Sequence, residues 1–255
     1  MIDLTDSHAH LDDSSFDHDR QDVVRRARQA GVSRIVVPAI HRASWERIEQ
    51  LCAECPEAAP AYGMHPLYLH HHRPEHVDQL TTWLVEHRAV AVGEIGLDYF
   101  VEGLDREQQQ IYFERQLRVA RQADLPVIVH ARRAMDEVTA TLRRIGGLRG
   151  VVHSFSGSEQ QAEQLWRLGF CIGIGGPVTY DRAQRLRRIV AGMPMEHLLL
   201  ETDAPDQPGA CHRGQRNEPA NLLDVLRVVA ELRGSTETEV AAATTANARA
   251  LFRLP

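Results

Sequence analysis

Six side chains that could bind a divalent cation follow or end short apolar segments of this sequence. They are His8, His10, Glu94, His130, His153 and Asp203. His8 and His10 stand two residues apart on an extended segment, so both imidazoles point to the same face and can reach one ion. A mixture of imidazole and carboxylate ligands suits zinc, manganese, iron or nickel better than calcium, and carboxylates also admit magnesium. The sequence therefore predicts a divalent-metal site.

These residues can meet only if their segments run side by side. Eight short apolar segments alternate with longer amphipathic stretches, and the predicted strands are Ile2–Asp6, Arg34–Pro38, Ala59–Gly63, Ala89–Gly93, Pro126–Val129, Gly150–His153, Phe170–Ile174 and Leu198–Glu201. Eight strand–helix alternations predict an α/β protein with a parallel sheet, and favour a closed (β/α)₈ TIM barrel over an open sheet. The 255 residues suit one such barrel, which uses about 250. We expect a single domain over residues 1–255.

The carboxyl ends of parallel strands meet at one face of a barrel, where such enzymes place their active sites. Five of the predicted strands lead into His8, Glu94, His130, His153 and Asp203. When His65, which follows the third predicted strand, is counted with them, the separations along the chain match one or two strand–helix units. Taken singly, a buried histidine is more often a hydrogen-bonded core residue than a metal ligand. The shared register favours a metal site for the group, and the central place of Glu94 predicts that it bridges two ions.

Helical spacing predicts helices over residues 20–30, 108–123, 159–168, 183–191 and 236–252. The expected apolar side chains of the second of these helices are Ile111, Phe113, Leu117 and Ala120. Thr236 and Glu239 have the spacing of a capping box at the start of the last helix. We expect this last helix to pack on the exterior of the barrel.

Composition limits the class of function. The net charge is −6, which argues against a protein that coats duplex DNA but permits an enzyme that grips a few nucleotides. Hydrophobic residues make up 43% and charged residues 25%, so a sizeable core can form. The sequence contains neither a membrane-spanning segment nor a signal peptide, which predicts a cytoplasmic protein. Cys52 and Cys55 form a single C-x-x-C at the end of an expected helix, and we interpret them as helix cysteines rather than metal or redox groups.

Two further side chains could contact a substrate. Arg132 follows His130 by two residues and could bind a phosphate oxygen bidentately, although a lone arginine is more often a solvated charge. Asp98, in Gly96-Leu97-Asp98-Tyr99, could be an acid or base, or a partner that orients a ligand. A G-x-S-x-G nucleophile elbow is absent from the sequence, so serine hydrolysis has little support.

Over nearly its whole length the sequence resembles the TatD family of metal-dependent deoxyribonucleases, within the amidohydrolase-like barrels. The matching motifs are Asp6-Ser7-His8-Ala9-His10-Leu11, Gly63-Met64-His65-Pro66, Gly93-Glu94-Ile95-Gly96-Leu97-Asp98-Tyr99, His130-Ala131-Arg132, His153-Ser154-Phe155-Ser156-Gly157, Glu201-Thr202-Asp203-Ala204-Pro205 and Arg216-Asn217-Glu218-Pro219. Asp203-Ala204-Pro205-Asp206 followed by Gly214-Gln215-Arg216-Asn217 looks most like the YjjV-like branch.

The resemblance implies a TIM barrel with one to three divalent ions that hydrolyses phosphodiester bonds of DNA, from the 3′ end. It implies that His8, His10, Glu94 and Asp203 hold the first ion, and that Glu94, His130 and His153 hold the second. It also implies that Glu201 orients ligands or helps to bind a third ion. Some relatives lack the His-x-His pair, and there the histidine at the place of His65 is drawn to the metals or substrate. The stretch Gln207–Arg213 differs from other branches, which leaves substrate preference open.

We therefore expect a deoxyribonuclease with two divalent ions (zinc, magnesium, manganese or nickel), with Asp203, Glu94 and Glu201 as its catalytic residues. Asp203 would accept the proton of the attacking water. His65, Arg132 and Asp98 would contact the substrate, a short or single-stranded DNA end, and neither a membrane nor an obligate protein partner is expected. One alternative is a related metalloenzyme acting on an amide, lactone or ester. Such enzymes often carry a lysine on the fourth strand, where this chain has Glu94. A structural metal protein and a DNA-binding module are the remaining alternatives.

Overall fold

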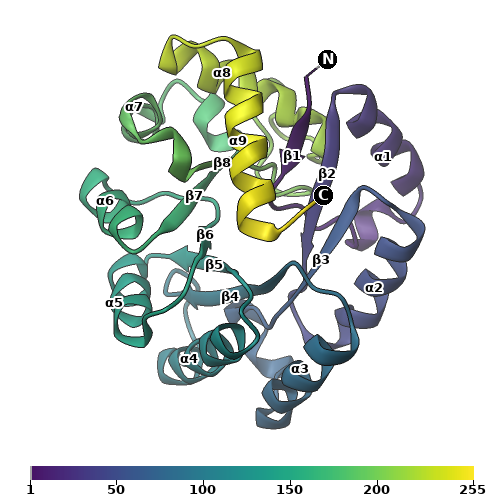
Figure 1. The fold of residues 1–255 in the computed structure, drawn as a ribbon, viewed down its shortest axis with the longest axis vertical. Coiled ribbons are helices and arrows are strands. Elements are labelled where there is room, and N and C mark those ends of the chain that lie inside the picture. Colours follow the sequence, from purple (N-terminus) through teal and green to yellow (C-terminus); the bar gives the residue numbers. More distant parts are fainter. Residues whose placement is uncertain (1) are drawn as a thin grey trace.

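The computed structural model describes residues 2–255, and its eight strands form one parallel sheet in which each strand pairs with the next (Figure 1). The strands are β1 (Leu4–Asp6), β2 (Val32–Pro38), β3 (Ala58–Tyr62), β4 (Ala91–Asp98), β5 (Val127–Arg132), β6 (Gly150–Val152), β7 (Phe170–Ile174) and β8 (Leu198–Leu200). The Ser7 amide donates to the carbonyl of Leu200 at 3.0 Å, which joins the last strand to the first. The predicted TIM barrel is confirmed.

Helices surround the sheet and follow its strands in turn. The α-helices are α1 (Arg20–Gln29), α2 (Trp45–Glu54), α3 (Pro74–Glu86), α4 (Arg106–Gln122), α5 (Met135–Ile145), α6 (Glu159–Arg167), α7 (Gln184–Gly192), α8 (Leu222–Arg233) and α9 (Glu237–Phe252). Short 3₁₀ segments are η1 (Ser14–Phe16), η2 (Arg42–Ser44), η3 (Pro66–His71), η4 (Gly176–Thr179), η5 (Met195–His197), η6 (Ala210–His212) and η7 (Pro219–Asn221). None of these helices is long and apolar enough to cross a bilayer.

Two separate cores follow from the alternation of side chains along the strands. In β2, Ile35 and Val37 pack outward with the helices, whereas Val36 points into the barrel. The inner core joins Val36 and its counterparts on other strands to residues of α9 such as Phe252. The strand ends at the amino-terminal end of the barrel are thereby covered, and the loops at the other end remain open to form a site.

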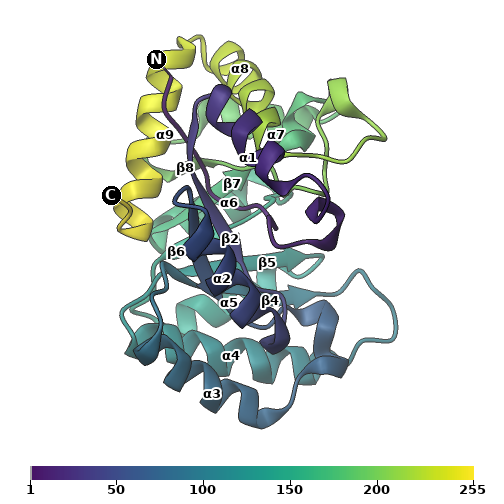
Figure 2. The ribbon, with the colours of Figure 1, turned by 90° about the vertical axis from the view of Figure 1, so that its right-hand side faces the viewer.

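The last helix is placed differently from our expectation. Its capping box is confirmed, because the Thr236 hydroxyl accepts from the Glu239 amide and the Glu239 carboxylate accepts from the Thr236 amide. Instead of packing only on the exterior, α9 reaches across the amino-terminal end of the barrel, beside both chain termini (Figure 2). Its Leu251 and Phe252 fill the inner core, so the helix closes the barrel at the end remote from the predicted ligands.

Helix α4 corrects a second expectation. Ile111 was expected on its apolar face but is 50% exposed, whereas Gln109 and Gln116 are buried at 1% and 0% exposure. The amide of Gln109 bonds to both the N–H and the carbonyl of Asp98, and that of Gln116 does the same with Met64. Asp98 is the last residue of β4 and Met64 lies just beyond the end of β3, so α4 fixes the carboxyl ends of both strands.

The C-x-x-C pair lies where the sequence predicted. Cys52 is in α2 and Cys55 immediately follows it, and both thiols are free. Burial raises the pKa of Cys52 to about 12, so it is a protonated, unreactive thiol at neutral pH.

Candidate metal centre

Four of the predicted ligands converge at the carboxyl-terminal face of the barrel. His8 and His10 follow β1, Glu94 lies within β4, and Asp203 follows β8. His8 Nε2 lies 3.2 Å from His10 Nε2, 3.4 Å from Glu94 Oε2 and 3.4 Å from Asp203 Oδ1. His10 Nε2 is 3.5 Å from the same Glu94 oxygen and 3.7 Å from the same Asp203 oxygen. Ligands about 2.1 Å from a tetrahedral ion stand about 3.4 Å apart, so this set fits one divalent cation.

A second set uses the other oxygen of Glu94. His130 Nδ1 lies 3.0 Å and His153 Nε2 lies 2.7 Å from Glu94 Oε1, and the two nitrogens are 3.3 Å apart. His130 is in β5 and His153 follows β6. Three ligand atoms at these separations can hold a cation and leave further positions for water or substrate, which is the pattern of catalytic rather than structural sites.

The β4 backbone brings Glu94 to this position by passing unusually close to β5. A Cβ on Gly96, which has φ +146°, would lie only 2.0 Å from the carbonyl oxygen of His130. Only glycine permits this approach. The pairing between β4 and β5 continues past Glu94 to Asp98 and Arg132, so both strands extend beyond the predicted ends at Gly93 and Val129.

Neighbouring acceptors leave the ligating nitrogens free. His10 Nδ1 lies 3.2 Å from the Pro38 carbonyl, so in the neutral ring the proton is on Nδ1 and Nε2 is unprotonated. His130 Nε2 likewise donates to Asp98 Oδ2 at 3.0 Å, which frees its Nδ1. The other Asp98 oxygen accepts from the Phe100 and Val101 amides, and the side chain has no exposed surface. This placement favours Asp98 as an orienting partner of His130 over the predicted contact with substrate.

His65 lies beside the second set, but the tautomer of its neutral ring makes Nε2 a hydrogen-bond donor. The Leu67 amide donates to His65 Nδ1 at 3.1 Å, so the proton of the neutral ring is on Nε2. That nitrogen is 3.0 Å from Glu94 Oε1. Although His65, Glu94 and His130 are close enough to surround a cation, a protonated Nε2 cannot ligate one. His65 is therefore placed to donate a hydrogen bond at the site, as a substrate-binding residue would.

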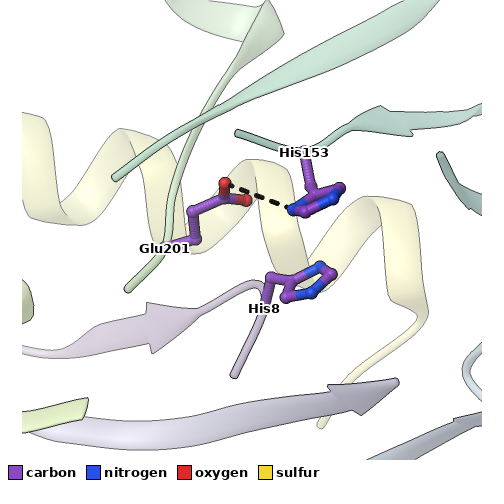
Figure 3. A group of neighbouring side chains, drawn as sticks. All are labelled: His8, His153 and Glu201. Carbon is purple, nitrogen blue, oxygen red and sulfur yellow. Dashed lines mark ion pairs between the residues drawn. The ribbon is translucent and has the colours of Figure 1, made fainter. Parts of the chain in front are cut away.

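Glu201 lies beneath both ligand sets, inside the barrel. His8 and His153 stack with ring centroids 4.0 Å apart, and Glu201 lies beside them (Figure 3). Glu201 Oε1 accepts from the Ser154 amide and is 3.9 Å from His153 Nδ1. Glu201 has no exposed surface, and burial raises its pKa to about 8. A Cβ on Gly173 would lie 2.0 Å from Glu201 Oε2, so the missing side chain makes room for the carboxylate.

This third group suits hydrogen bonding better than a third ion. The Nδ1 atoms of His8 and His153 and the Oε2 atom of Glu201 are buried without a hydrogen-bond partner among residues 2–255. If each Nε2 bound a cation, the two rings would be neutral and would carry their protons on Nδ1. Two N–H donors beside the carboxyl oxygens of Glu201 need no cation. Glu201 is placed to orient the two histidines, directly or through an enclosed water.

The charges at the centre favour cation binding. Burial would raise the pKa of Glu94, but the neighbouring charges of His153, His65 and His8 outweigh it and hold the pKa well below the usual range. Burial would lower the pKa of His153, but the Glu94 charge outweighs it and raises the pKa to about 10. Burial lowers the pKa of His8 to about 4, so that ring is neutral at pH 7. A cation would replace the proton of His153 as the counter-charge of Glu94.

Asp203 is held with one oxygen free for this centre. Its amide donates to the His8 carbonyl at 2.9 Å, and its φ of +57° turns the chain sharply after β8. The Gln207 side-chain amide donates to Asp203 Oδ2, while Oδ1 faces His8 and His10. Gln207 was not among the predicted site residues. Its segment was recognised only as a stretch that departs from other branches, and nothing in its spacing indicates this contact.

A cleft of about 880 Å³ opens above the ligands. Arg132 lines it, with the guanidinium 3.7 Å from the centre of the Phe100 ring. His65 and Asp203 line it too, whereas Asp98 and Glu201 do not. Arg182 and Arg185 also line it and were not predicted, because a lone arginine carries no sequence signal of its own.

Comparisons with known proteins match this chain over nearly its whole length. A family model, TatD related DNase, matches residues 5–253. The uncharacterized metal-dependent hydrolase YjjV of Escherichia coli (strain K12) is 42% identical over 98% of each chain. The crystal structure of the YjjV TatD homologue from E. coli K12 covers 100% of each chain with a TM-score of 0.96 and 41% identity. A 3′-5′ ssDNA/RNA exonuclease TatD of Pantoea vagans (strain C9-1) is 33% identical over 98% of this chain and 100% of its own.

Proposed function

The chain belongs to the TatD family of metal-dependent hydrolases, and from this premise we propose that it is a deoxyribonuclease that cleaves phosphodiester bonds at short or single-stranded DNA ends, from 3′ to 5′, with two divalent ions. The position of Glu94 carries the proposal. Its Oε2 lies 3.4 Å from His8 and its Oε1 lies 2.7 Å from His153, so one carboxylate belongs to both ligand sets. Paired cations of this kind suit an in-line displacement at phosphorus. The relative named as an exonuclease supports DNA as the substrate.

Bound ions would supply Lewis acidity to the phosphoryl oxygens and a water of lowered pKa. The protein's own residues would do the rest. Asp203, oriented by the hydrogen bond that Gln207 donates to its Oδ2, would accept the proton of the attacking water. The Nε2–H of His65 and the guanidinium of Arg132 would donate to the non-bridging oxygens of the phosphate, where charge develops as the bond breaks.

Glu201 is proposed to act through the ligands and not on the substrate. It is wholly buried and lies beneath His8 and His153, so it cannot reach a phosphate in the cleft. Its contribution is to keep both rings in the tautomer that presents Nε2 to the ions. Asp98 would do the same for His130 from the outer side.

The test is to strip the protein of metal and assay end-labelled single- and double-stranded DNA with magnesium, manganese or zinc. We expect metal-dependent shortening of the labelled strands. Glu94→Gln and Asp203→Asn, with folding verified by circular dichroism and thermal unfolding, should each lose at least about 100-fold in rate. Arg188→Ala is the matched control, because this exposed residue of α7 does not line the cleft.

Two outcomes would reject the proposal. One is full metal-dependent cleavage by folded Glu94→Gln and Asp203→Asn, which would move the active centre elsewhere. The other is turnover of lactones or amides without any cleavage of DNA, which would favour the alternative metalloenzyme.

A further inference from the structure

Three arginines on one side of the cleft have no carboxylate partner among residues 2–255. Arg132 ends β5, Arg182 lies between η4 and α7, and Arg185 is in the first turn of α7. Uncharged groups hold them in place. Arg132 stacks on the Phe100 ring, Arg182 lies 5.3 Å from the Tyr180 ring, and Arg185 donates to the Ser156 carbonyl at 2.8 Å. Their charges are left for a ligand, and we call these three residues the basic arc.

The other loops around the cleft have a different chemistry. Asp12 and Asp13, after β1, and Asp206, after β8, line the cleft and take no part in an ion pair among residues 2–255. Beyond them Ile40, Leu67 and Tyr68 follow β2 and β3. We call the three aspartates the acidic arc, and the other three residues the apolar arc.

The order of the strands fixes how these arcs stand to one another. Because each strand neighbours the next, the basic arc spans strands five to seven and the apolar arc lies across the barrel at strands two and three. The acidic arc separates them on one side, at strands eight and one. The metal ligands lie between the arcs. The basic arc attracts a polyanion, and the acidic arc repels it. No arginine lines the cleft at the apolar arc.

We propose, on the basis of the function proposed above, that the cleft binds the end of a single nucleic acid strand in one direction across the metal centre. The phosphates on the continuing side lie along the basic arc, and the last nucleoside rests its base against Tyr68. Tyr68 is placed for this contact, because its ring lies 5.8 Å from that of His65 and it lines the cleft. A cleft of about 880 Å³ lies in the range of small-ligand sites, which suits a few nucleotides better than a duplex.

Arginine suits this role. The chain contains 29 lysine and arginine residues, and every one of them is an arginine. A guanidinium binds two phosphate oxygens at once, and it stays charged at any pH at which the protein is folded. Each phosphate contact to a single strand steepens the fall of log affinity with log salt concentration by about 0.7. Over the tenfold range from 1 M to 0.1 M salt, one contact therefore raises the affinity about fivefold. Two contacts together should therefore contribute about 25-fold.

The first experiment compares Arg182→Ala/Arg185→Ala with Arg188→Ala, which changes the same helix outside the cleft. Binding of a fluorescein-labelled single-stranded 12-mer is followed by anisotropy from 0.05 to 0.3 M salt. Cleavage of the 12-mer and of bis(p-nitrophenyl) phosphate with manganese is measured in parallel. The double variant should bind about 25-fold more weakly at 0.1 M salt, with a slope reduced by about 1.4. Its kcat/KM on the 12-mer should fall relative to that on the small diester, and Arg188→Ala should change none of these quantities.

The second experiment tests the apolar arc with strands whose last residue is a nucleoside or an abasic sugar. The unmodified protein should bind the strand with the complete last nucleoside about tenfold more tightly than the abasic strand. This is the affinity that stacking of one base on an aromatic ring contributes. Tyr68→Ala should lose this preference. A preference that survives in Tyr68→Ala would overturn the placement of the base.

The outcomes separate this inference from the proposed function. A double variant that binds like Arg188→Ala, or an unmodified protein that does not bind the 12-mer, overturns the basic arc whether or not DNA is cleaved. Tight, salt-dependent binding without cleavage of the 12-mer or the small diester with any metal leaves the strand site standing and overturns the proposed nuclease.

Discussion

Replacing Gly173 by alanine tests whether Glu201 positions the metal ligands. The new Cβ would lie 2.0 Å from Glu201 Oε2, 2.6 Å from its Cδ and 2.9 Å from Oε1. Since ordinary contact begins near 3.4 Å, the carboxylate or the strand must move by more than 1 Å. Glu201 is wholly buried, so it has no free space to enter. Overpacking of this kind costs about 1–3 kcal/mol, or a fall in Tm of about 2–4 °C for each kcal/mol in a protein of this size.

The displaced carboxylate would also release the two histidines. Loss of a hydrogen-bonding partner behind a ligand commonly weakens metal binding by about 10–100-fold. Thermal unfolding of the metal-free protein measures the first effect, and competition with a chromogenic chelator measures the second. Gly192→Ala is the control, because a Cβ there would meet nothing within 4 Å. It should leave metal affinity unchanged.

A double-mutant cycle with Glu201→Ala isolates the contact. If the clash with Glu201 is the cause, Gly173→Ala should cost less than about 0.5 kcal/mol in the Glu201→Ala background, and the interaction energy should exceed about 1 kcal/mol. Additive effects on stability would refute the steric reasoning. Unchanged metal affinity in a destabilised Gly173→Ala protein would refute the positioning role of Glu201.

Two further predictions follow from hydrogen bonds that the sequence did not reveal. In Asp98→Asn the side-chain amide can donate to His130 Nε2, which would move the ring proton to Nδ1. One of the two ions should then bind about 10–100-fold more weakly in a calorimetric titration. Unchanged affinities for both ions would contradict this assignment. Hydrogen bonds from Arg144 and Gln110 lower the pKa of Glu114 to about 2 in the folded protein. A lowered carboxyl pKa stabilises the fold above the unfolded value of about 4.5, and this is lost as the pH falls towards 2. Glu114→Gln should therefore cost about 1 kcal/mol in urea unfolding at pH 7 and progressively less below pH 4.5; an equal cost at pH 3 would contradict the assignment.

The barrel could be predicted from the sequence because its signals are local and repeat. Each strand is a short apolar run followed by an amphipathic stretch, and all eight predicted strands overlap the observed ones. A parallel sheet then leaves one place for the residues at the carboxyl ends of its strands. The convergence of His8, Glu94 and Asp203 follows from chain connectivity alone, which is why their positions were accessible without a structure. That they bind ions stays a prediction.

Periodicity was less reliable for the helices, because it identifies residues on one face without saying what that face meets. Helix α4 turns Gln109 and Gln116 inward and leaves Ile111 exposed. The two glutamines pair buried backbone groups at the ends of two strands, which an apolar side chain could not do. The position of α9 could likewise not be predicted from its own sequence, because the inner core that it covers is formed by several strands of the barrel together.

The sequence by itself determined which residue types reach the carboxyl-terminal face, and hence the predicted ligand set of a divalent-metal site. Only the tertiary structure decided what each group can do there. The Leu67 amide makes His65 a donor, Asp98 directs His130, and the space left by Gly173 places Glu201 beneath the ligands. Protonation and orientation depend on partners contributed by distant segments. Such partners leave no pattern in the residues that they control.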